Sequence, residues 1–300
     1  MQRDLIGYGK DYPVIEWPNQ ARIAVSLVVH YEEGAELRPN EEPPEHEANV
    51  EGFGIVGGLG KRSWNVDLMF EYGSRRGFWR IIDLLARHDV KATFLCSGKA
   101  LELNPAAARE ITAQGHEACG HGYRWEYEYT LSREKEQEHI AKTVEAIRKT
   151  TGKRPVGWNS RGPGPNTREL LLAEGGFIYD SDTYGDDLPY FVEVGGKKFL
   201  TLPYALDVND EKFWSNLVLP GFTNPRDFFA MMKGSFDQLY AEGETHPRMM
   251  SVGIHLRISG RPGRAKQIED FIKYAKGFPG VWFARRVDIA EWWLKKYKPL

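Results

Sequence analysis

Apolar runs alternate along the chain with segments of helical periodicity. Residues 21–31 (ARIAVSLVVHY) are almost continuously apolar, which is typical of a strand covered on both faces. Residues 77–89 then place apolar side chains three and four positions apart, which is the spacing of an amphipathic helix. Further strands are predicted at 91–98, 116–121, 154–160, 177–182, 197–204, 249–255 and 281–285, and further helices at 104–115, 132–151, 166–176, 224–243, 264–277 and 288–297.

This rhythm of about seven strand-then-helix units predicts an α/β fold with a parallel sheet under helical cover. A closed or nearly closed barrel fits best, and a doubly wound open sheet is the alternative. We expect a single domain over residues 1–300, because no composition shift or linker divides the chain. Residues 34–66 break the rhythm with an acidic, Pro/Gly-rich stretch, which we interpret as a long loop insertion and a pocket lid.

Composition narrows the function classes. The 300 residues are 41% hydrophobic and 27% charged, and a net charge of −2 argues against nucleic-acid and anionic-membrane partners. No signal peptide or apolar run of about 18 residues is present, so we expect a cytoplasmic protein. Cys96 and Cys119 lie in apolar runs and are expected to be buried, reduced thiols. Nine Trp and fourteen Tyr favour a homo-oligomer, because interfaces are rich in aromatic residues.

Candidate chemistry lies where strands end. In α/β barrels the reactive groups sit at the carboxyl ends of the strands. Polar and aromatic side chains gather at these positions here, namely Glu32, Glu33, His121, Trp125, Asn159, Arg161, Asp182, His255 and Arg257.

A metal site is the first possibility to weigh. His121 lies between two glycines, and a second histidine four residues later would supply half of a zinc site, but Trp125 cannot ligate a metal. Catalytic zinc needs three protein ligands, and His121 and Glu33 supply only two. His116 points to the opposite face of the strand. We therefore predict no metal, and we treat the other histidines as structural or surface residues, namely His30, His46, His88, His116, His139 and His246.

The order of these groups resembles the polysaccharide deacetylase (NodB-homology) family. The similarity is carried by an acidic pair, a glycine-flanked histidine, an Arg/Pro/Gly loop and a late Ile-His. It implies a distorted (β/α)7-type barrel that hydrolyses amides of amino sugars with a bound divalent metal. The family's first motif carries two aspartates, one the base and one a ligand, where this chain has Glu32 and Glu33; its second motif carries two histidines, where this chain has His121 and Trp125.

Longer strings are similar to the metal-independent allantoinases and cyclic-imide hydrolases, which are usually oligomers. They include RDLIGYG (3–9), EYGSRRGFWR (71–80), YDSDTYGDDLPY (179–190) and VWFARRVDIA (281–290). This resemblance implies a hydrolase of non-peptide carbon–nitrogen bonds that opens a small cyclic amide or ureide without a cofactor.

Without a metal, water must be activated by a side chain. Glu32 is the candidate base, and we expect burial to raise its pKa and so make it a better proton acceptor. His121, His255 and Arg161 are the candidate catalytic donors to the oxyanion, and one histidine would protonate the leaving nitrogen. We assign substrate contacts to Glu33, Trp125, Asn159, Asp182 and Arg257.

Two alternatives stay open from the sequence. One is a deacetylase of N-acetylated glycans with a divalent metal such as zinc on His121, Glu33 and a further group. The other is a non-catalytic barrel that binds a ligand.

Overall fold

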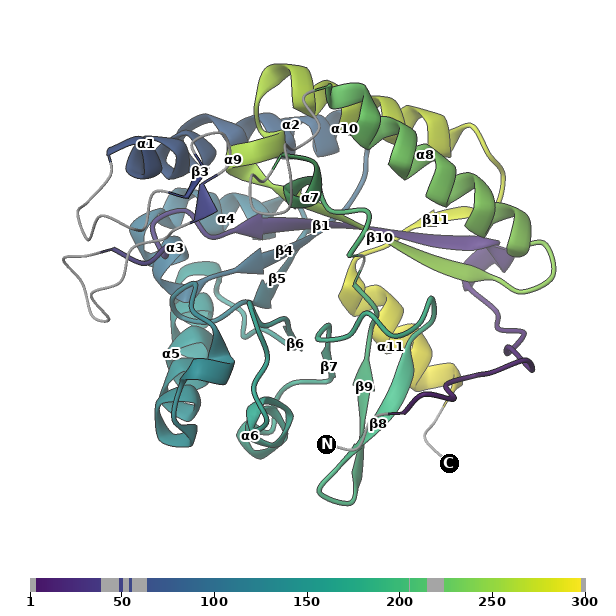
Figure 1. Cartoon of the computed structure of the whole chain (residues 1–300), viewed down its shortest axis with the longest axis horizontal. Coiled ribbons are helices and arrows are strands. Elements are labelled where there is room, and N and C mark those ends of the chain that lie inside the picture. Colours follow the sequence, from purple (N-terminus) through teal and green to yellow (C-terminus); the bar gives the residue numbers. More distant parts are fainter. Residues whose placement is uncertain are drawn as a thin grey trace.

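A curled sheet forms the centre of the molecule (Figure 1). The computed structural model describes residues 4–38, 49–50, 54–55, 64–204, 206–214 and 224–297. Within them the strand order is β10-β1-β4-β5-β6-β7-β9-β8, with β11 also paired to β1. The bounds are β1 Ile23–Tyr31, β4 Thr93–Cys96, β5 Glu117–Gly120, β6 Gly157–Trp158, β7 Tyr179–Asp180, β8 Tyr190–Val194, β9 Lys197–Thr201, β10 Arg248–His255 and β11 Val281–Phe283. The predicted parallel α/β barrel is confirmed, with an antiparallel β8 at one edge.

Helices cover the outside of this sheet, except for α11 (Arg286–Lys296), which packs against its inner face. Three of them begin where an Asn or Ser side chain accepts a backbone hydrogen bond, at Asn104, Ser132 and Asn224, the residue types that favour helix N-caps. The bounds are α1 Trp64–Tyr72, α2 Phe78–Arg87, α3 Gly98–Leu103, α4 Pro105–Ala113, α5 Arg133–Thr151, α6 Thr167–Glu174, α7 Asp210–Trp214, α8 Pro225–Glu242, α9 Leu256–Ser259, α10 Pro262–Lys276 and α11 Arg286–Lys296. None of the described helices is long and apolar enough to cross a membrane.

Some elements differ from the prediction. The helix expected at 77–89 starts earlier, because α1 runs through a π-helical turn at Gly73–Gly77 into α2. Strand β8 was not predicted and forms a hairpin with β9 across Gly195 and Gly196, both at positive φ, the conformation that tight hairpin turns require. The short hairpin β2 (Asn49–Val50) and β3 (Gly54–Ile55) lies within the predicted loop. Most of the predicted lid, residues 34–66, lies outside the described residues.

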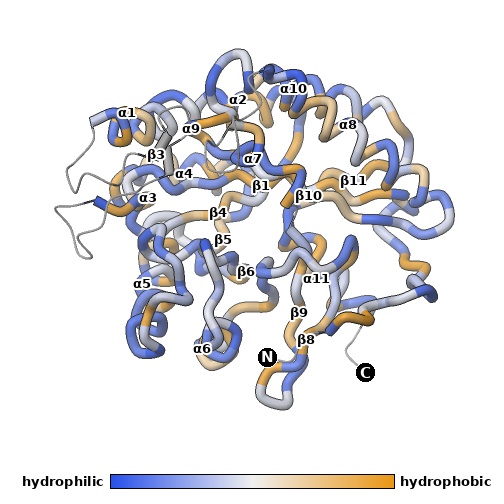
Figure 2. Tube along the Cα trace, viewed as in Figure 1, coloured by the Kyte–Doolittle hydropathy of each residue, from blue (hydrophilic) through white to orange (hydrophobic). Residues whose placement is uncertain are grey.

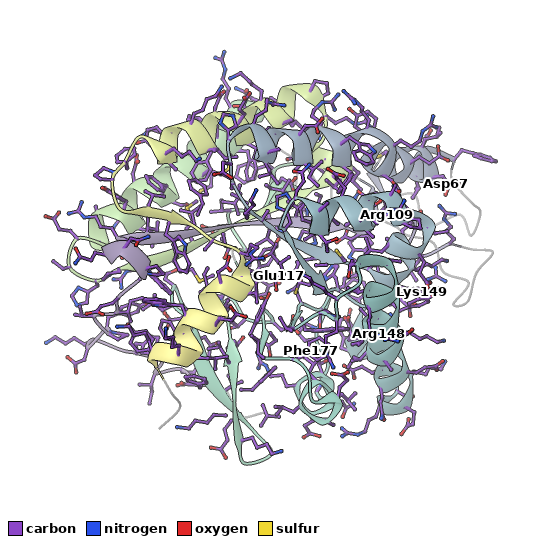
Figure 3. All side chains as sticks on the ribbon, turned by 180° about the vertical axis from the view of Figure 1, so that it is seen from behind. Asp67, Arg109, Glu117, Arg148, Lys149 and Phe177 are labelled. Atoms are coloured by element: carbon purple, nitrogen blue, oxygen red, sulfur yellow. The ribbon has the colours of Figure 1, made fainter. Side chains whose placement is uncertain are left out.

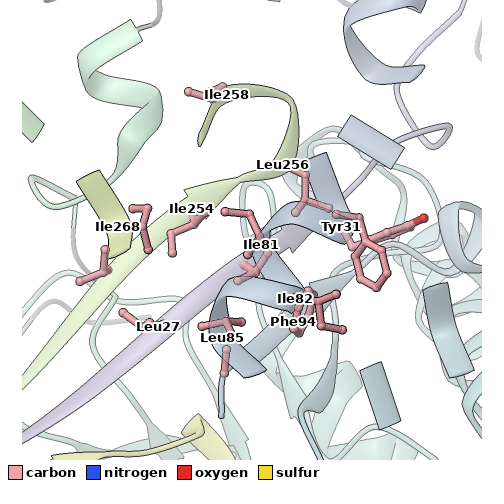
Figure 4. Close-up of a cluster of buried hydrophobic side chains, with 14 of the residues drawn as sticks. Leu27, Tyr31, Ile81, Ile82, Leu85, Phe94, Ile254, Leu256, Ile258 and Ile268 are labelled. Atoms are coloured by element: carbon pink, nitrogen blue, oxygen red, sulfur yellow. The ribbon is translucent and has the colours of Figure 1, made fainter. Parts of the chain in front are cut away.

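The alternation of side chains along β1 divides the interior into two layers. One set packs outward against the helical layer, including Leu27 and Tyr31 beside Ile81 and Ile254 (Figure 4). The alternate positions face the inside of the barrel, where Ala24 and Val28 contact apolar side chains of other strands and of α11. Strands are accordingly apolar along much of their length (Figure 2). The same alternation carries the end of β1 into the barrel mouth. Cys96 and Cys119 are buried and form no disulfide, as predicted.

The sheet does not close by strand pairing between β10 and β9 among the described residues. Arg286, at the start of α11, bridges this gap instead. Its guanidinium donates to the Ser181 and Ser251 hydroxyls at 2.7 and 2.8 Å, and to the Leu202 and Pro203 carbonyls at 2.7 and 2.9 Å. A fully buried cation therefore holds together the strand ends from which the site is built.

Candidate active site

Glu32 lies at the centre of the barrel mouth, directly after β1, and is fully buried. One carboxylate oxygen, Oε1, lies 2.8 Å from His30 Nδ1 and 3.2 Å from His121 Nε2. The other oxygen, Oε2, accepts from Arg257 Nη1 at 2.7 Å. His255 Nε2 is 3.9 Å from Oε1. The structure therefore gathers the predicted Glu32, His121 and His255 around one carboxylate.

Strand pairing explains why the imidazoles meet there. His30 and His255 are register partners on the adjacent parallel strands β1 and β10, and their rings stack with centroids 4.0 Å apart. His121 follows β5, and Gly122 beside it has a φ of 76°. A Cβ at Gly122 would lie 2.7 Å from the Arg124 carbonyl oxygen, so this turn requires glycine.

The imidazoles are oriented by their other nitrogen atoms. His121 Nδ1 donates to the Asn159 carbonyl at 2.7 Å, which leaves Nε2 toward Glu32. His255 Nδ1 lies 2.7 Å from Asp210 Oδ1, and the same carboxylate accepts from the His255 backbone N–H at 2.8 Å. Burial opposes the charged form of His255, but Asp210 and Glu32 outweigh it and raise its pKa to about 9. His255 is therefore an imidazolium at neutral pH, with Nε2–H on the side of Glu32.

The predicted direction of the Glu32 pKa shift is wrong. Burial alone would raise its pKa, but Arg257, then His30 and His255, together with the hydrogen bond from His121, hold the pKa of Glu32 well below its usual range. Burial, together with the neighbouring His255 charge, lowers the pKa of His30 to about 3, so His30 is neutral. Glu32 is thus a stable anion in the resting site, and a weak base on its own.

A pocket of about 90 Å³ opens onto this cluster. All four predicted catalytic residues line it, namely Glu32, His121, His255 and Arg161. Two predicted substrate contacts, Trp125 and Asn159, line it as well. Its remaining walls come from residues not assigned to the site from the sequence, namely His30, Ser160, Tyr184, Tyr204, Leu206, Asn209, Glu211 and Lys212.

The other three predicted substrate contacts, Glu33, Asp182 and Arg257, are not among the pocket walls, and their role in binding substrate stays a prediction. Glu33 follows Glu32 and so faces the other side of the chain, where its Oε2 accepts from the Glu32 N–H and its Oε1 packs on Gly73. Burial raises the pKa of Glu33 to about 8. Asp182 is occupied by the Ser160 N–H and hydroxyl at 2.7 and 2.8 Å.

Arg257 lies behind Glu32 rather than in the pocket. Its guanidinium packs 4.9 Å from the Trp125 ring centroid and 4.7 Å from that of Phe70. On the other side, Arg161 stacks 3.6 Å from the centroid of Trp125 and donates to the Trp125 carbonyl at 2.8 Å. Trp125 therefore contacts two guanidinium groups, that of Arg161 on the pocket wall and that of Arg257, which binds Glu32.

Sequence reasoning missed His30, although a signal was present. His30 lies two residues before Glu32 on a strand, and residues i and i+2 share a face. The same rule would have predicted that Glu33 faces away from the site. Tyr204 and Asp210 gave no such signal, because Tyr204 lies in the irregular segment after β9 and Asp210 begins the short helix α7, which was not predicted.

The residues fit a divalent metal poorly. His30, Glu32 and His255 can bring one ligand atom each within 4.8 Å of one another. However, Arg257 and the protonated His255 already place positive charge beside Glu32, and both ring nitrogens of His30 are engaged, by Glu32 and by the Tyr204 hydroxyl at 2.7 Å. A divalent cation would have to displace these contacts and lie against two cations.

Comparisons with known proteins match part of the chain in one case and nearly all of it in three others. The family model for polysaccharide deacetylase matches residues 61–173. A putative polysaccharide deacetylase of Schizosaccharomyces pombe is 37% identical over 98% of both chains. The crystal structure of a probable polysaccharide deacetylase from Pseudomonas aeruginosa superposes with a TM-score of 0.93 and 43% identity, covering 100% of both chains. The crystal structure of Puue allantoinase superposes with a TM-score of 0.94 and 42% identity, covering 100% of this chain and 99% of the other.

Proposed function

Starting from the fact that this chain belongs to the polysaccharide deacetylase family and is a hydrolase of non-peptide carbon–nitrogen bonds, we propose that it opens a small cyclic amide or ureide without a metal. The observation that carries the proposal is the buried Glu32 carboxylate, which is neutralised by Arg257 at 2.7 Å and by imidazoles. The likeness to an allantoinase over the full chain supports the cyclic substrate.

Water is activated between Glu32 and His121 in this proposal. Glu32 Oε1 and His121 Nε2 are 3.2 Å apart, and His121 Nδ1 is committed to the Asn159 carbonyl. His121 Nε2 is the hydrogen-bond donor to Glu32, so the proton taken from water goes to the Glu32 carboxylate, the one acceptor of this pair. The water oxygen then attacks the ring carbonyl carbon. A general base of this kind contributes about 10²–10⁴-fold.

His255 supplies the proton that the leaving nitrogen needs. Its raised pKa of about 9 keeps it charged, and Asp210 holds its ring with Nε2 toward Glu32. Arg161, on the pocket wall beside Trp125, donates to the oxyanion. The ring carbon–nitrogen bond breaks, the nitrogen takes the His255 proton, and the product is a ring-opened carboxylate. Losing one preorganised donor typically costs about 10²–10³ in kcat.

A cyclic substrate suits this site better than an acetylated sugar chain. A strained five-membered imide or ureide is more electrophilic at carbon than an open amide, so it depends less on a Lewis acid. The pocket volume of about 90 Å³ also favours a small ligand. The cytoplasmic compartment and the homo-oligomer stay predictions.

The test is hydrolysis of allantoin, hydantoin and succinimide in the presence of EDTA, with elemental analysis of the purified protein. We expect turnover of at least one substrate by metal-free protein and its loss in Glu32→Gln. Stoichiometric zinc, with activity abolished by the chelator, would contradict the metal-free mechanism.

A metal-dependent deacetylase of N-acetyl amino sugars is the second candidate. The proximity of the donor atoms of His30, Glu32 and His255 favours it. It predicts release of acetate from chito-oligosaccharides that requires added divalent metal. The non-catalytic barrel is set aside, because the chain is a hydrolase.

A further inference from the structure

A chain of buried hydrogen bonds reaches Glu32 from the open side of the barrel. Asn209 Nδ2 lies 3.1 Å from the Tyr204 hydroxyl, which lies 2.7 Å from His30 Nε2. His30 Nδ1 lies 2.8 Å from Glu32 Oε1. Each of the four side chains is buried. The chain joins three parts of the fold, because Tyr204 follows β9, Asn209 bridges to Gly253 in β10, and His30 belongs to β1.

The direction of every bond in this chain is fixed. Asn209 Oδ1 accepts from the Glu211 backbone N–H at 2.9 Å, so the amide nitrogen is the atom that faces Tyr204. An amide nitrogen only donates, so the Tyr204 oxygen accepts there. The Tyr204 hydrogen goes to His30 Nε2, because the Glu32 carboxylate can only accept and takes the single ring hydrogen of neutral His30. The ring hydrogen of neutral His30 must then lie on Nδ1, where it points at Glu32.

We propose that Tyr204 is a positioning residue that locks His30 in the Nδ1–H tautomer and thereby holds the Glu32 carboxylate toward His121. The opposite tautomer would place the lone pair of Nδ1 against a carboxylate oxygen 2.8 Å away, and two acceptors repel. The proposal rests on the hydrolytic role of Glu32 given above.

The fold reserves space for the Tyr204 hydroxyl. A Cβ at Gly253 would lie 2.4 Å from the Tyr204 oxygen and 2.8 Å from Asn209 Nδ2. Any larger residue at this point of β10 would therefore displace the phenol from His30. The hydroxyl also occupies the one nitrogen of His30 that Glu32 does not use, and this keeps the ring from turning toward another ligand.

Tyr204→Phe tests the proposal in two independent ways. The ¹⁵N chemical shifts of His30, identified by their disappearance in His30→Gln, report the tautomer without any substrate. We expect the Nδ1–H form in the parent protein and a loss of that preference in Tyr204→Phe. With the cyclic amide that the enzyme turns over, kcat should fall up to about 100-fold with KM little changed, because the phenyl ring keeps its place in the pocket wall while the reacting groups lose their alignment.

Tyr179→Phe is the matched control. Tyr179 is also a fully buried tyrosine in the barrel, and its hydroxyl donates to Glu117 at 2.8 Å. Glu117 starts β5, at the end of the strand opposite His121, and lies beside α11 (Figure 3). Losing this hydroxyl should lower the melting temperature as Tyr204→Phe does, but it should leave kcat and the His30 tautomer unchanged.

Asn209→Asp is the second variant. A carboxylate in place of the amide accepts the Tyr204 hydrogen instead of donating to its oxygen, so the hydrogen is drawn from His30 with no change in side-chain size. The expected result is the same tautomer change and a fall in kcat. The proposal is overturned by an Nε2–H tautomer in the parent protein, or by Tyr204→Phe matching Tyr179→Phe in kcat. A correct tautomer with no turnover of any cyclic amide would instead refute the proposed function.

Discussion

At the scale of single residues, position after a strand was enough to predict Glu32, His121 and His255, because carboxyl ends of parallel strands meet at one rim. The alternation of side chains along β1 and just after it decides which residues there face the site. His30 and Glu32 point to the same side, and Glu33 points to the other. The charge state of Glu32 was beyond such reasoning. It depends on Arg257, which is 225 residues away in sequence and packs behind the carboxylate only once β10 lies beside β1.

Removing Arg257 should shift the pH dependence of catalysis. Arg257 is the main group that lowers the pKa of Glu32 against the effect of burial. In Arg257→Met the pKa of Glu32 rises, so Glu32 becomes protonated at higher pH and the acid limb of kcat/KM moves upward. The variant should also lose about 3–5 kcal/mol of stability, because a buried charge loses its partner. Arg257→Lys keeps the charge, so the acid limb of its kcat/KM profile should lie closer to that of the parent protein. If the acid limb of folded Arg257→Met does not move, Arg257 does not set the pKa of Glu32.

Glu33 should make the protein less stable as the pH rises. Burial raises its pKa to about 8, above the ordinary value of 4.5, so the folded state holds a proton that the unfolded state releases. This contribution to the unfolding free energy is complete below pH about 4.5 and is lost as the pH rises toward 8, by at most about 1.4 kcal/mol per pH unit. Urea titrations at pH 5 and pH 8 should show a smaller difference for Glu33→Gln than for the parent. Equal differences would mean that Glu33 does not titrate in this range.

At the scale of elements, helical periodicity predicted most helices to within a few residues. Ser132 and Gly152 bound α5 as expected, with Gly152 at a φ of 76°. The feature that periodicity did not predict, the π-helical turn between α1 and α2, depends on contacts with other elements. The glycines at both ends of the π-helical turn Gly73–Gly77 look like helix breakers in sequence, but each lies against a neighbouring group, Gly73 on Glu33 and Gly77 on α9.

Gly77→Ala tests this reading of the turn. Alanine favours a helix over glycine by about 1 kcal/mol, but a Cβ at Gly77 would lie 2.3 Å from the Leu256 carbonyl oxygen. Backbone atoms cannot turn aside, so the clash should win and lower the unfolding free energy by about 1–3 kcal/mol. Gly234→Ala in α8 is the control: nothing lies within 4 Å of its added Cβ, and stability should rise by about 0.5–1 kcal/mol. Equal effects of the two substitutions in urea denaturation would show that helix propensity alone matters at position 77.

At the scale of the whole molecule, the strand–helix rhythm predicted a barrel but could not show how it closes. In the described part of the chain the sheet ends at β10 on one edge and at the β9–β8 hairpin on the other, and Tyr204 and Asn209 enter the site on this open side. In the sequence, Arg286 stood out only as part of VWFARRVDIA (281–290), one of the strings that resemble the allantoinases and cyclic-imide hydrolases. Its role became visible from four hydrogen bonds to segments that are far apart in sequence.

Arg286→Met should therefore weaken both the fold and the site. The substitution keeps an unbranched side chain of similar length but leaves two hydroxyls and two carbonyls in the barrel interior without their donor, so we expect a loss of at least about 3 kcal/mol in urea denaturation. The adjacent Arg285 is the control, because it is partly exposed and pairs mainly with Asp288 of its own helix turn; Arg285→Met should cost about 1 kcal/mol. Arg286 joins the segment after β9, which leads to Tyr204, to Ser251 in the middle of β10, the strand that ends in His255. We therefore expect kcat also to fall in Arg286→Met under conditions where the variant is fully folded, and to stay near the parent value in Arg285→Met. If Arg286→Met is destabilised yet keeps its kcat, the strands on the two sides of the open edge stay aligned without the guanidinium. The bridge between Asn209 and Gly253 would then be the contact that sets the geometry of the site.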